Sequence, residues 1–391
     1  MPLPRNLLIA LSATFVAFCT LYTPQPMLPL LALEFSVSSS EAGLLVTATM
    51  LPLGLAPVFY GYFLQAIPAK LMLSVALSLL LCVQFGFGFA TEFWHLLLLR
   101  SAQGLLLPAI FTALMTYCSS MAPEGQVRKS MGWYIGATIL GGFGGRLIGG
   151  YFASLFEWQS AFVMLGFLLI VPIFLLRYAS ADAQISFARL DFYSVTRVLK
   201  ARNFRYIYLT LFCVFFVFSG ILNVLPFRLT AIDASVSPLL ISTLYIGYLI
   251  GMPVAIFCEP IARLFGSDKR GLLVGLLLLA TGLCAFLLRD FNALLVMMFC
   301  LAAGYFLIHS TLSGLVNQRA REHKGVVNGL YVSIYYMSGA LGSWLPGYFY
   351  DSLGWNRLIL IFLAILCLSV WFILQLRLHL PEDPVSNELS H

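Results

Sequence analysis

Four ionisable side chains stand inside long apolar stretches of this 391-residue chain, namely Arg100, Arg146, Glu259 and His309. A charge in an apolar environment is costly, and an arginine at the centre of a bilayer costs roughly 2.5–3.5 kcal/mol or more. Such groups are expected to face an internal cavity or a partner. We therefore take these four side chains as the first candidates for substrate binding and proton transfer.

The two arginines favour an anionic ligand. Both lie in the first half of the chain, in which no acidic residue falls inside an apolar segment. A guanidinium group matches a carboxylate or phosphate through two parallel hydrogen bonds, so Arg100 and Arg146 could together hold an anionic substrate group. The alternative is that each arginine bonds helix-end carbonyl groups, Gln103 or Gln25, and only stabilises the fold.

Arg146 stands in the glycine-rich stretch GGFGGRLIGGYF at 141–152. Small residues let two helices approach closely, which explains the glycines but not the arginine. No strand precedes this stretch, and its spacing fails the pattern of a dinucleotide-binding loop. The stretch therefore predicts helix packing around one buried cation, with no nucleotide cofactor.

Glu259 and His309 are the candidates for proton coupling. Glu259 lies four residues before Arg263, so the two can pair along one helix face, and we favour this pairing. The imidazole of His309 can take up and release a proton near physiological pH. The alternative for His309 is a neutral, hydrogen-bonded side chain.

Uncharged polar side chains on the same segments could line a substrate site. Hydroxyl-bearing aromatic rings suit an amphipathic ligand, although each one alone is more often a packing residue. The substrate-binding candidates of this kind are Tyr22, Gln25, Gln103, Asn223, Tyr245, Tyr305, Ser310, Tyr331 and Tyr335. The eight cysteines all lie in apolar stretches without metal-ligand spacing, so we expect neither a metal nor a cofactor.

The elements that carry these residues are membrane helices. Hydrophobic residues make up 61% of the chain, charged residues 10%, and the mean hydropathy is +0.94, whereas soluble domains carry about 25% charged residues. A spanning helix needs about 20 mostly apolar residues, and nothing alternates as a membrane strand would. The first apolar run is too long for a signal peptide and is expected to be a retained helix. Twelve segments qualify as helices: 7–33, 42–65, 70–90, 93–118, 128–154, 160–177, 205–232, 236–265, 270–288, 292–318, 325–350 and 355–378.

The basic residues predict the orientation. With the N-terminus in the cytoplasm, seventeen of the 22 Lys and Arg residues lie on the inner side and three on the outer side. Both termini are therefore predicted to be cytoplasmic. A polar, basic connection at 178–204 divides a six-helix bundle at 1–177 from a second one at 205–391, and it could hold an amphipathic helix or be a solvated linker. No basic cluster large enough to bind nucleic acid is present.

The two halves contain an internal repeat. Residues 132–158 align without gaps on 329–355 at an offset of 197, with eight of 27 positions identical. Arg146 corresponds to Ser343, so the arginine belongs to one half only. A parallel repeat of two six-helix bundles is typical of secondary transporters that bind substrate between their halves.

LLLLRSAQG at 96–104 fits the pattern LxxxRxxQG, with Arg100, Gln103 and Gly104 in place, and ATILGGFGGR at 137–146 partly fits GxxxGPxxGG through Gly141 and Gly145. On these motifs the chain resembles the major facilitator superfamily over its whole length. The combination of GGxxGRLIxG with HS at 309–310 and RAxxxKG at 319–325 looks most like the YnfM-type drug or sugar efflux group. The resemblance implies an all-α membrane protein of two six-helix bundles, a monomer that works by alternating access.

One loop departs from the family pattern. The family usually carries GxLaDRxGRr between helices two and three, and this chain has GYFLQAIPAK at 61–70. Gly61 and Lys70 are retained, but Gln65 replaces the acid that normally steadies the outward-open state. We take Gly61, Gln65, Lys70, Gly141 and Gly145 as gating candidates, with the standard inner gate in doubt.

The sequence therefore predicts a transporter and not an enzyme. Its partners would be the lipid bilayer of the bacterial inner membrane, protons, and a small organic anion such as a carboxylate-bearing metabolite or a siderophore. The resemblance favours export by proton antiport, while uptake of the same anion remains open. The alternative is a proton-coupled exporter of neutral or cationic drugs or sugars, with structural arginines. A membrane enzyme or sensor would need a catalytic cluster or an appended soluble domain.

Overall fold

The computed structural model describes residues 5–63, 67–120, 122, 126–179, 184–185, 192–320 and 324–377. These residues are helical apart from turns and one short antiparallel strand pair, β1 (Ile67–Pro68) with β2 (Gln184–Ile185). The helices of the first half are α1 (Arg5–Tyr22), η1 (Gln25–Met27), α2 (Leu28–Glu34), α3 (Ser39–Phe63), α4 (Ala69–Gly86), η2 (Phe87–Phe89), α5 (Phe93–Ser120), α6 (Val127–Leu155) and α7 (Gln159–Leu176). Those of the second half are α8 (Phe192–Lys200), α9 (Arg202–Ile232), α10 (Pro238–Leu244), η3 (Tyr245–Ile250), α11 (Gly251–Ile256), α12 (Cys258–Leu264), α13 (Asp268–Ala285), α14 (Phe291–Arg319), α15 (Lys324–Leu353) and α16 (Trp355–Gln375).

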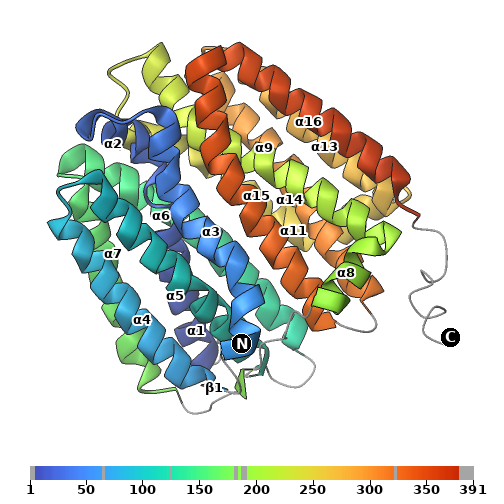
Figure 1. The fold of residues 1–391 in the computed structure, drawn as a ribbon, viewed down its shortest axis with the longest axis horizontal. Coiled ribbons are helices and arrows are strands. Elements are labelled where there is room, and N and C mark those ends of the chain that lie inside the picture. The colour runs from blue at the N-terminus through green and yellow to red at the C-terminus, as the bar shows by residue number, and fades with distance from the viewer. Residues whose placement is uncertain are drawn as a thin grey trace.

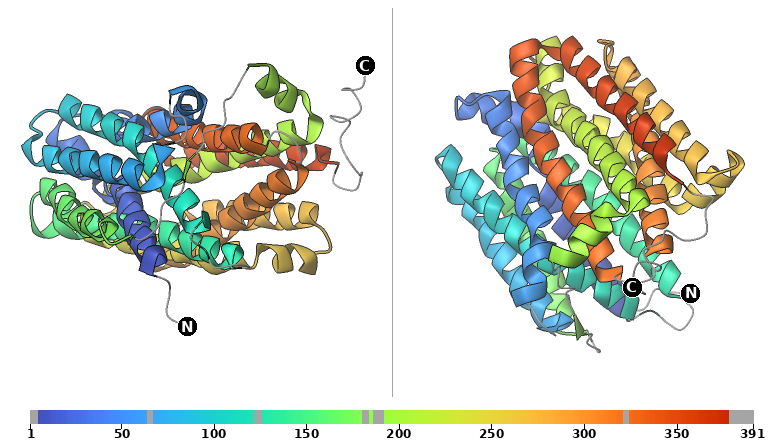
Figure 2. Two further views of the ribbon diagram at one scale, coloured as in Figure 1. Left: turned by 90° about the horizontal axis from the view of Figure 1, so that it is seen from below. Right: turned by 45° about the vertical axis from the view of Figure 1, so that its right-hand side comes forward.

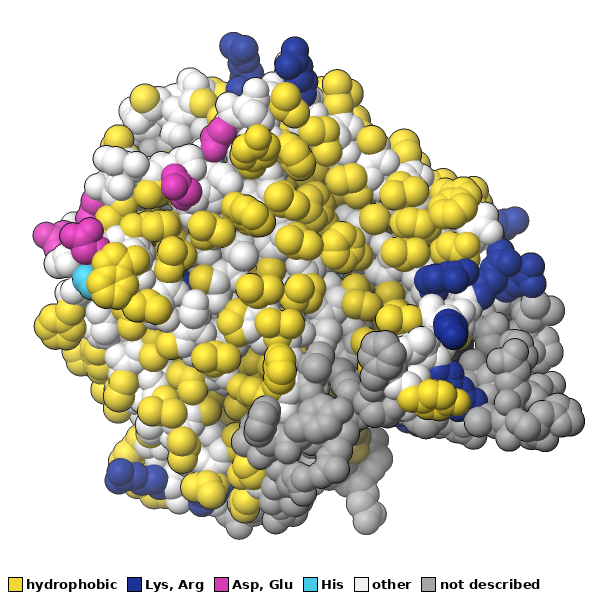
Figure 3. Space-filling view, in the orientation of Figure 1, with side chains coloured by type: hydrophobic (Ala, Val, Ile, Leu, Met, Phe, Trp, Pro, Cys, Tyr) yellow, Lys and Arg dark blue, Asp and Glu magenta, His cyan; other side chains and the backbone are white. Residues whose placement is uncertain are grey.

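The helices are long and apolar enough to cross a bilayer. Within the described ranges, nine segments meet this standard by both length and composition. The three remaining predicted spans, α6, α13 and α15, have 29, 18 and 30 residues, long enough for the hydrocarbon core at 1.5 Å per residue. Figure 3 shows hydrophobic side chains across the middle of one face, with charged side chains mostly at its margins.

The two halves pack side by side. In Figures 1 and 2 the first half, in blue to green, lies against the second half, in yellow to red, with α3 beside α15. A Cβ atom on Gly145 of α6 would lie 2.2 Å from the carbonyl oxygen of Cys19, and one on Gly342 of α15 would lie 2.5 Å from that of Phe216. Both pairs are related by the offset of 197, so the repeat read in the sequence also holds for helix contacts.

Two predicted helices are interrupted. The segment 7–33 divides into α1, η1 and α2, because Pro24 and Pro26 remove backbone donors. The segment 236–265 divides into α10, η3, α11 and α12, and its middle adopts a 3₁₀ helix. Each interruption lies beside polar or aromatic side chains such as Gln25 and Tyr245.

The connection between the halves contains a helix. α8 covers nine residues and carries Arg197 and Lys200 in its last turn. The following helix, α9, already begins at Arg202, three residues before the predicted start. Residues 180–183 and 186–191 of the connection lie outside the described ranges.

Candidate functional site

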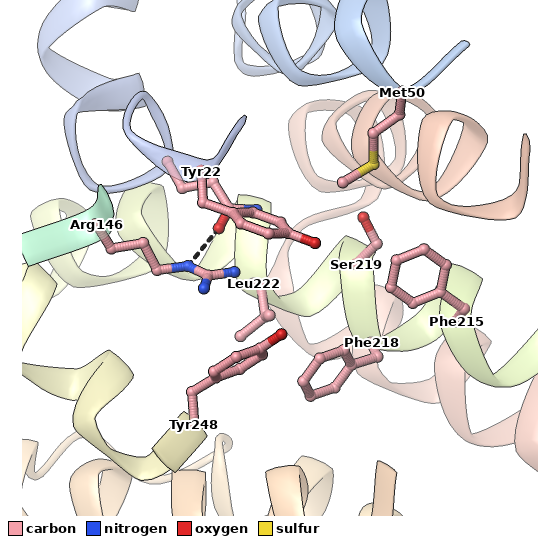
Figure 4. Close-up of a pocket in the computed structure, with 9 residues that line it drawn as sticks. Tyr22, Met50, Arg146, Phe215, Phe218, Ser219, Leu222 and Tyr248 are labelled. Atoms are coloured by element: carbon pink, nitrogen blue, oxygen red, sulfur yellow. Dashed lines mark hydrogen bonds between the residues drawn. The ribbon is translucent and has the colours of Figure 1, made fainter. Parts of the chain in front are cut away.

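A cavity lies where the two halves meet. The atom-free space around it is about 230 Å³, a value that includes volume open to the surroundings, so the enclosed cavity is smaller than this. Both halves contribute to its wall, as Figure 4 shows. The lining residues are Tyr22, Gln25, Met50 and Arg146 from the first half and Phe215, Phe218, Ser219, Leu222 and Tyr248 from the second.

Arg146 is the charged group of this cavity. Its side chain is only 1% exposed, with Nε donating to Oε1 of Gln25 at 2.6 Å and one terminal nitrogen donating to the carbonyl oxygen of Gly142 at 2.8 Å. The guanidinium carbon lies 4.4 Å from the ring centre of Tyr22 and 4.8 Å from those of Tyr245 and Tyr248. Rings at these distances stabilise a cation, so the protein holds the arginine without a carboxylate from any described residue.

A chain of hydrogen bonds connects Arg146 to the second half. Nε2 of Gln25 donates to Oδ1 of Asn223 at 3.0 Å, and Nδ2 of Asn223 donates to Oγ of Ser343 at 2.9 Å. All of these side chains are buried. Gln25 thus joins the cation of α6 to α9 and α15, and buried amides that bond on both sides fix each other's orientation.

Aromatic rings form the wall opposite Arg146. Phe218 stacks on Tyr305 at a centroid distance of 3.7 Å and an interplanar angle of 1°, and Phe215 stacks on Tyr335 at 3.9 Å and 9°. The hydroxyl of Tyr305 donates to that of Tyr335 at 3.1 Å. Tyr245 lies behind Arg146 and donates to the carbonyl oxygen of Leu222.

Arg100 lies outside the cavity. Its Nε donates to the carbonyl oxygen of Leu45 at 2.8 Å, and its terminal nitrogens donate to those of Thr20 and Leu21 at 2.9 and 2.7 Å. It also donates to Oε1 of Gln103 at 2.6 Å. The structure therefore supports the second interpretation of Arg100 and Gln103, in which they stabilise the fold.

The two proton-coupling candidates differ in burial and in hydrogen-bond partners. His309 of α14 is half-buried, with Nδ1 3.1 Å from the hydroxyl oxygen of Tyr331, and its ring stacks on Tyr305 at 5.7 Å. Ser310 follows it outside the cavity lining. Glu259 of α12 is exposed and pairs with Arg263, as the four-residue spacing predicts, so it faces solvent and not the cavity.

The gating candidates do not form one gate. Nζ of Lys70 donates to the carbonyl oxygen of Ala179 at 2.9 Å, Gly61 lies in the last turn of α3, and Gln65 lies outside the described residues. Gly141 and Gly145 contact α1 within the first half, so they serve packing inside one bundle. The contact of α6 with the second half falls instead at Gly150, where a Cβ atom would lie 2.4 Å from the carbonyl oxygen of Pro238.

Several lining residues were not among the predicted candidates. Met50, Phe215, Phe218, Ser219 and Leu222 line the cavity, but four of them are apolar residues in apolar helices and carry no local signal. Ser219 could have been found, because it stands one helical turn before Asn223 and shares its face.

Comparison with known proteins identifies the family. The model of the Major Facilitator Superfamily matches residues 10–343. An uncharacterized transporter of Buchnera aphidicola subsp. Baizongia pistaciae is 26% identical over 94% of this chain and 91% of its own length. The inner membrane transport protein YnfM of Escherichia coli is 28% identical over 96% and 91%.

A weaker relative and a solved structure agree with this result. The multidrug resistance protein MdtG of Citrobacter koseri is 27% identical over 37% of this chain and 36% of its own. The crystal structure of a bacterial homolog of the human lysosomal transporter Spinster, in an inward-facing and occupied conformation, has a TM-score of 0.72 at 14% identity and covers 97% of this chain and 98% of its own. The chain therefore belongs to the major facilitator superfamily, a family of membrane transporters rather than enzymes.

Proposed function

We propose that the protein exports a small organic anion across the bacterial inner membrane, as a monomeric, proton-coupled carrier that works by alternating access. The observation that carries this proposal is Arg146, a buried cation that faces the cavity between the halves and pairs with no carboxylate of the described residues. Figure 4 shows its guanidinium directed into the cavity, between the rings of Tyr22 and Tyr248.

An anion would complete the hydrogen bonding of this group. Arg146 uses Nε and one terminal nitrogen within the protein, and a guanidinium carries five N–H donors. Two parallel N–H donors match the two oxygens of a carboxylate. A cationic substrate would be repelled by this charge, and a neutral one would gain hydrogen bonds without neutralising it.

Proton coupling would use the second half. His309 lies one turn beyond Tyr305 on α14 and bonds Tyr331 of α15, and Tyr305 stacks on Phe218 of the cavity wall. Imidazole is suited to reversible proton transfer near neutral pH. Glu259 is less suited, because its carboxylate is exposed and already paired with Arg263. The outward direction follows from the resemblance to efflux proteins.

A second candidate function is export of neutral or cationic drugs. The relative that favours it carries the name multidrug resistance protein, over 37% of this chain. In this case the three tyrosines around Arg146 would suffice to hold the cation, and its role would be structural.

A ligand-binding assay separates the two functions. Purified full-length protein is heated with benzoate, succinate or gluconate, with the corresponding amides, and with cationic dyes. A ligand at 100 times its Kd stabilises the folded protein by about 2.7 kcal/mol. We expect at least one carboxylate to raise the melting temperature, its amide to have little effect, and Arg146→Gln to abolish the response.

The matched control is Arg357→Gln, since Arg357 is exposed at the start of α16 and this variant should respond as the wild type does. Stabilisation by cationic dyes alone, or an unchanged carboxylate response in Arg146→Gln, would refute the anion proposal.

A further inference from the structure

The cavity combines its cation with a flat apolar wall. Phe215 and Phe218 stand one helical turn apart on α9, and both line the space that Arg146 faces. Each is stacked nearly parallel on a tyrosine that is not part of the lining. The tyrosines therefore support the two phenylalanine rings from behind, and the wall presented to the cavity is aromatic.

This wall is held in place by its neighbours. The hydroxyl groups of Tyr305 and Tyr335 are joined by a hydrogen bond of 3.1 Å, which ties the two stacked pairs together. Tyr305 stacks in turn on the ring of His309 at 7°. Because these rings are fixed before a ligand arrives, a planar ligand ring can stack on them at little cost in conformational entropy.

The cation also restricts the ligand. Figure 4 shows the guanidinium of Arg146 between Tyr22 and Tyr248, and both rings lie within 4.8 Å of its central carbon. Since rings cover its faces, the guanidinium could take an anion only along its N–H edge. A carboxylate bound in this way lies in the guanidinium plane, so the group that carries it extends toward the opposite wall.

From these observations we propose that the substrate is an aromatic carboxylate, with its carboxylate on the N–H edge of Arg146 and its ring against Phe218 and Phe215. The inference rests on the anionic substrate proposed above and specifies its chemical class. Ser219 and Leu222 complete the wall between the ring and the cation.

The test compares three probes of similar shape. Benzoate has the carboxylate and the aromatic ring, cyclohexanecarboxylate has the carboxylate on a saturated ring, and benzamide has the aromatic ring without the charge. Their dissociation constants are measured by calorimetry on the purified full-length protein at pH 7. Aromatic stacking adds enough affinity to lower the Kd of benzoate about three- to tenfold below that of cyclohexanecarboxylate, and we expect benzamide to bind much more weakly than either.

Two substitutions separate the contribution of the aromatic wall to binding from that of the cation. Phe218→Leu removes the aromatic face and keeps the apolar volume, so we expect the preference for benzoate over cyclohexanecarboxylate to fall below about twofold while carboxylate binding persists. Phe174→Leu is the matched control, because Phe174 is exposed on α7 and should leave the preference unchanged. Arg146→Gln, or Arg146→Lys if the first variant does not fold, should weaken both carboxylates and leave benzamide unaffected.

The outcomes distinguish this inference from the function on which it rests. Equal binding of benzoate and cyclohexanecarboxylate to the wild type would overturn the aromatic class and leave the anionic substrate in place. The same holds if Phe218→Leu retains the full preference. Tighter binding of benzamide than of benzoate, or no binding of any carboxylate, would overturn both.

Discussion

Arg146 and Ser343 occupy corresponding places in the two halves and have similar partners. Arg146 bonds Gln25 of η1, and Ser343 bonds Asn223 of α9. The offset of 197 maps Gln25 to the residue before Asn223. The repeat thus keeps a polar pair between the first and fifth helices of each bundle but places a positive charge in only one of them. Under the proposed function, selection by charge would belong to the first half.

Glycines around Arg146 set how closely α1 and α6 pack. A Cβ atom on Gly145 would lie 2.2 Å from the carbonyl oxygen of Cys19, and backbone cannot move aside as a flexible side chain can. We expect Gly145→Ala to push the two helices apart and to lower the free energy of unfolding by about 1–3 kcal/mol. The measurement is the thermal unfolding midpoint in detergent.

Gly132 provides the control on the same helix. A Cβ atom there would meet no heavy atom within 4 Å, and alanine is about 1 kcal/mol better than glycine inside a helix. Gly132→Ala should therefore leave the midpoint unchanged or raise it. Equal effects of the two substitutions would mean that helix propensity, and not the contact with α1, decides the stability at Gly145.

At the scale of elements, the break in the first membrane helix leaves backbone carbonyl groups that need hydrogen-bond donors from another helix. Thr23 makes the last backbone bond of α1, to Cys19, and the next donor in line would be residue 24, which is a proline without an N–H. The carbonyl groups of Thr20 and Leu21 instead accept from the guanidinium of Arg100. Arg100 of α5 thereby supplies the hydrogen bonds that the last carbonyl groups of α1 would otherwise lack.

Replacing Arg100 should consequently destabilise the fold. Arg100→Leu would leave the carbonyl oxygen of Thr20 and Oε1 of Gln103 without this donor in an apolar interior, and each such loss costs about 1–3 kcal/mol. We expect unfolding to become easier by roughly 3 kcal/mol or more, measured by thermal or denaturant unfolding. The same change at exposed Arg357 is the control. A stable Arg100→Leu protein that had lost carboxylate binding would instead place Arg100 in the substrate site.

The twelve-helix architecture could be predicted because each span is long and apolar, and the repeat GYF at 150–152 and 347–349 already related the two bundles. The interruptions could not be located in the same way. Prolines at 24 and 26 show that a helix is weakened, but whether it breaks depends on Arg100, a residue more than 70 positions away that satisfies the freed carbonyl groups. Arg146 could be singled out from its charge, whereas Phe218 could not, since nothing local separates a lining phenylalanine from a packing one.

At the scale of the whole molecule, the halves meet along α3 and α15, where α6 packs on α10, η3 and α11, and where η1 and α2 pack on α9. Along α3, the hydroxyl of Thr47 donates to the carbonyl oxygen of Ala340 at 2.7 Å, and close contacts occur at Gly43 and Gly54. Near α2, the side-chain bond between Gln25 and Asn223 crosses the interface. Because Gln25 also bonds Arg146, the anion of the proposed function would act on the same amide that joins the halves.

From that arrangement we expect Asn223 to stabilise the closed contact at the α2 end. Asn223→Leu removes the acceptor of Gln25 and leaves a buried amide N–H unpaired, which costs about 1–3 kcal/mol and should favour separation of the halves there. We expect hydrogen–deuterium exchange to become roughly tenfold faster in 28–34 and 238–244, since a loss of about 1.4 kcal/mol shifts such an equilibrium tenfold.

Exchange in α4, which packs within its own bundle, should stay unchanged. Asn317→Leu, at an exposed position on α14, controls for the substitution itself. If Asn223→Leu exchanges like the wild type in both segments, the remaining contacts at this end, among them that of α6 with α10 at Gly150 and Pro238, keep it closed, and the link from Arg146 through Gln25 does not govern the movement of the halves.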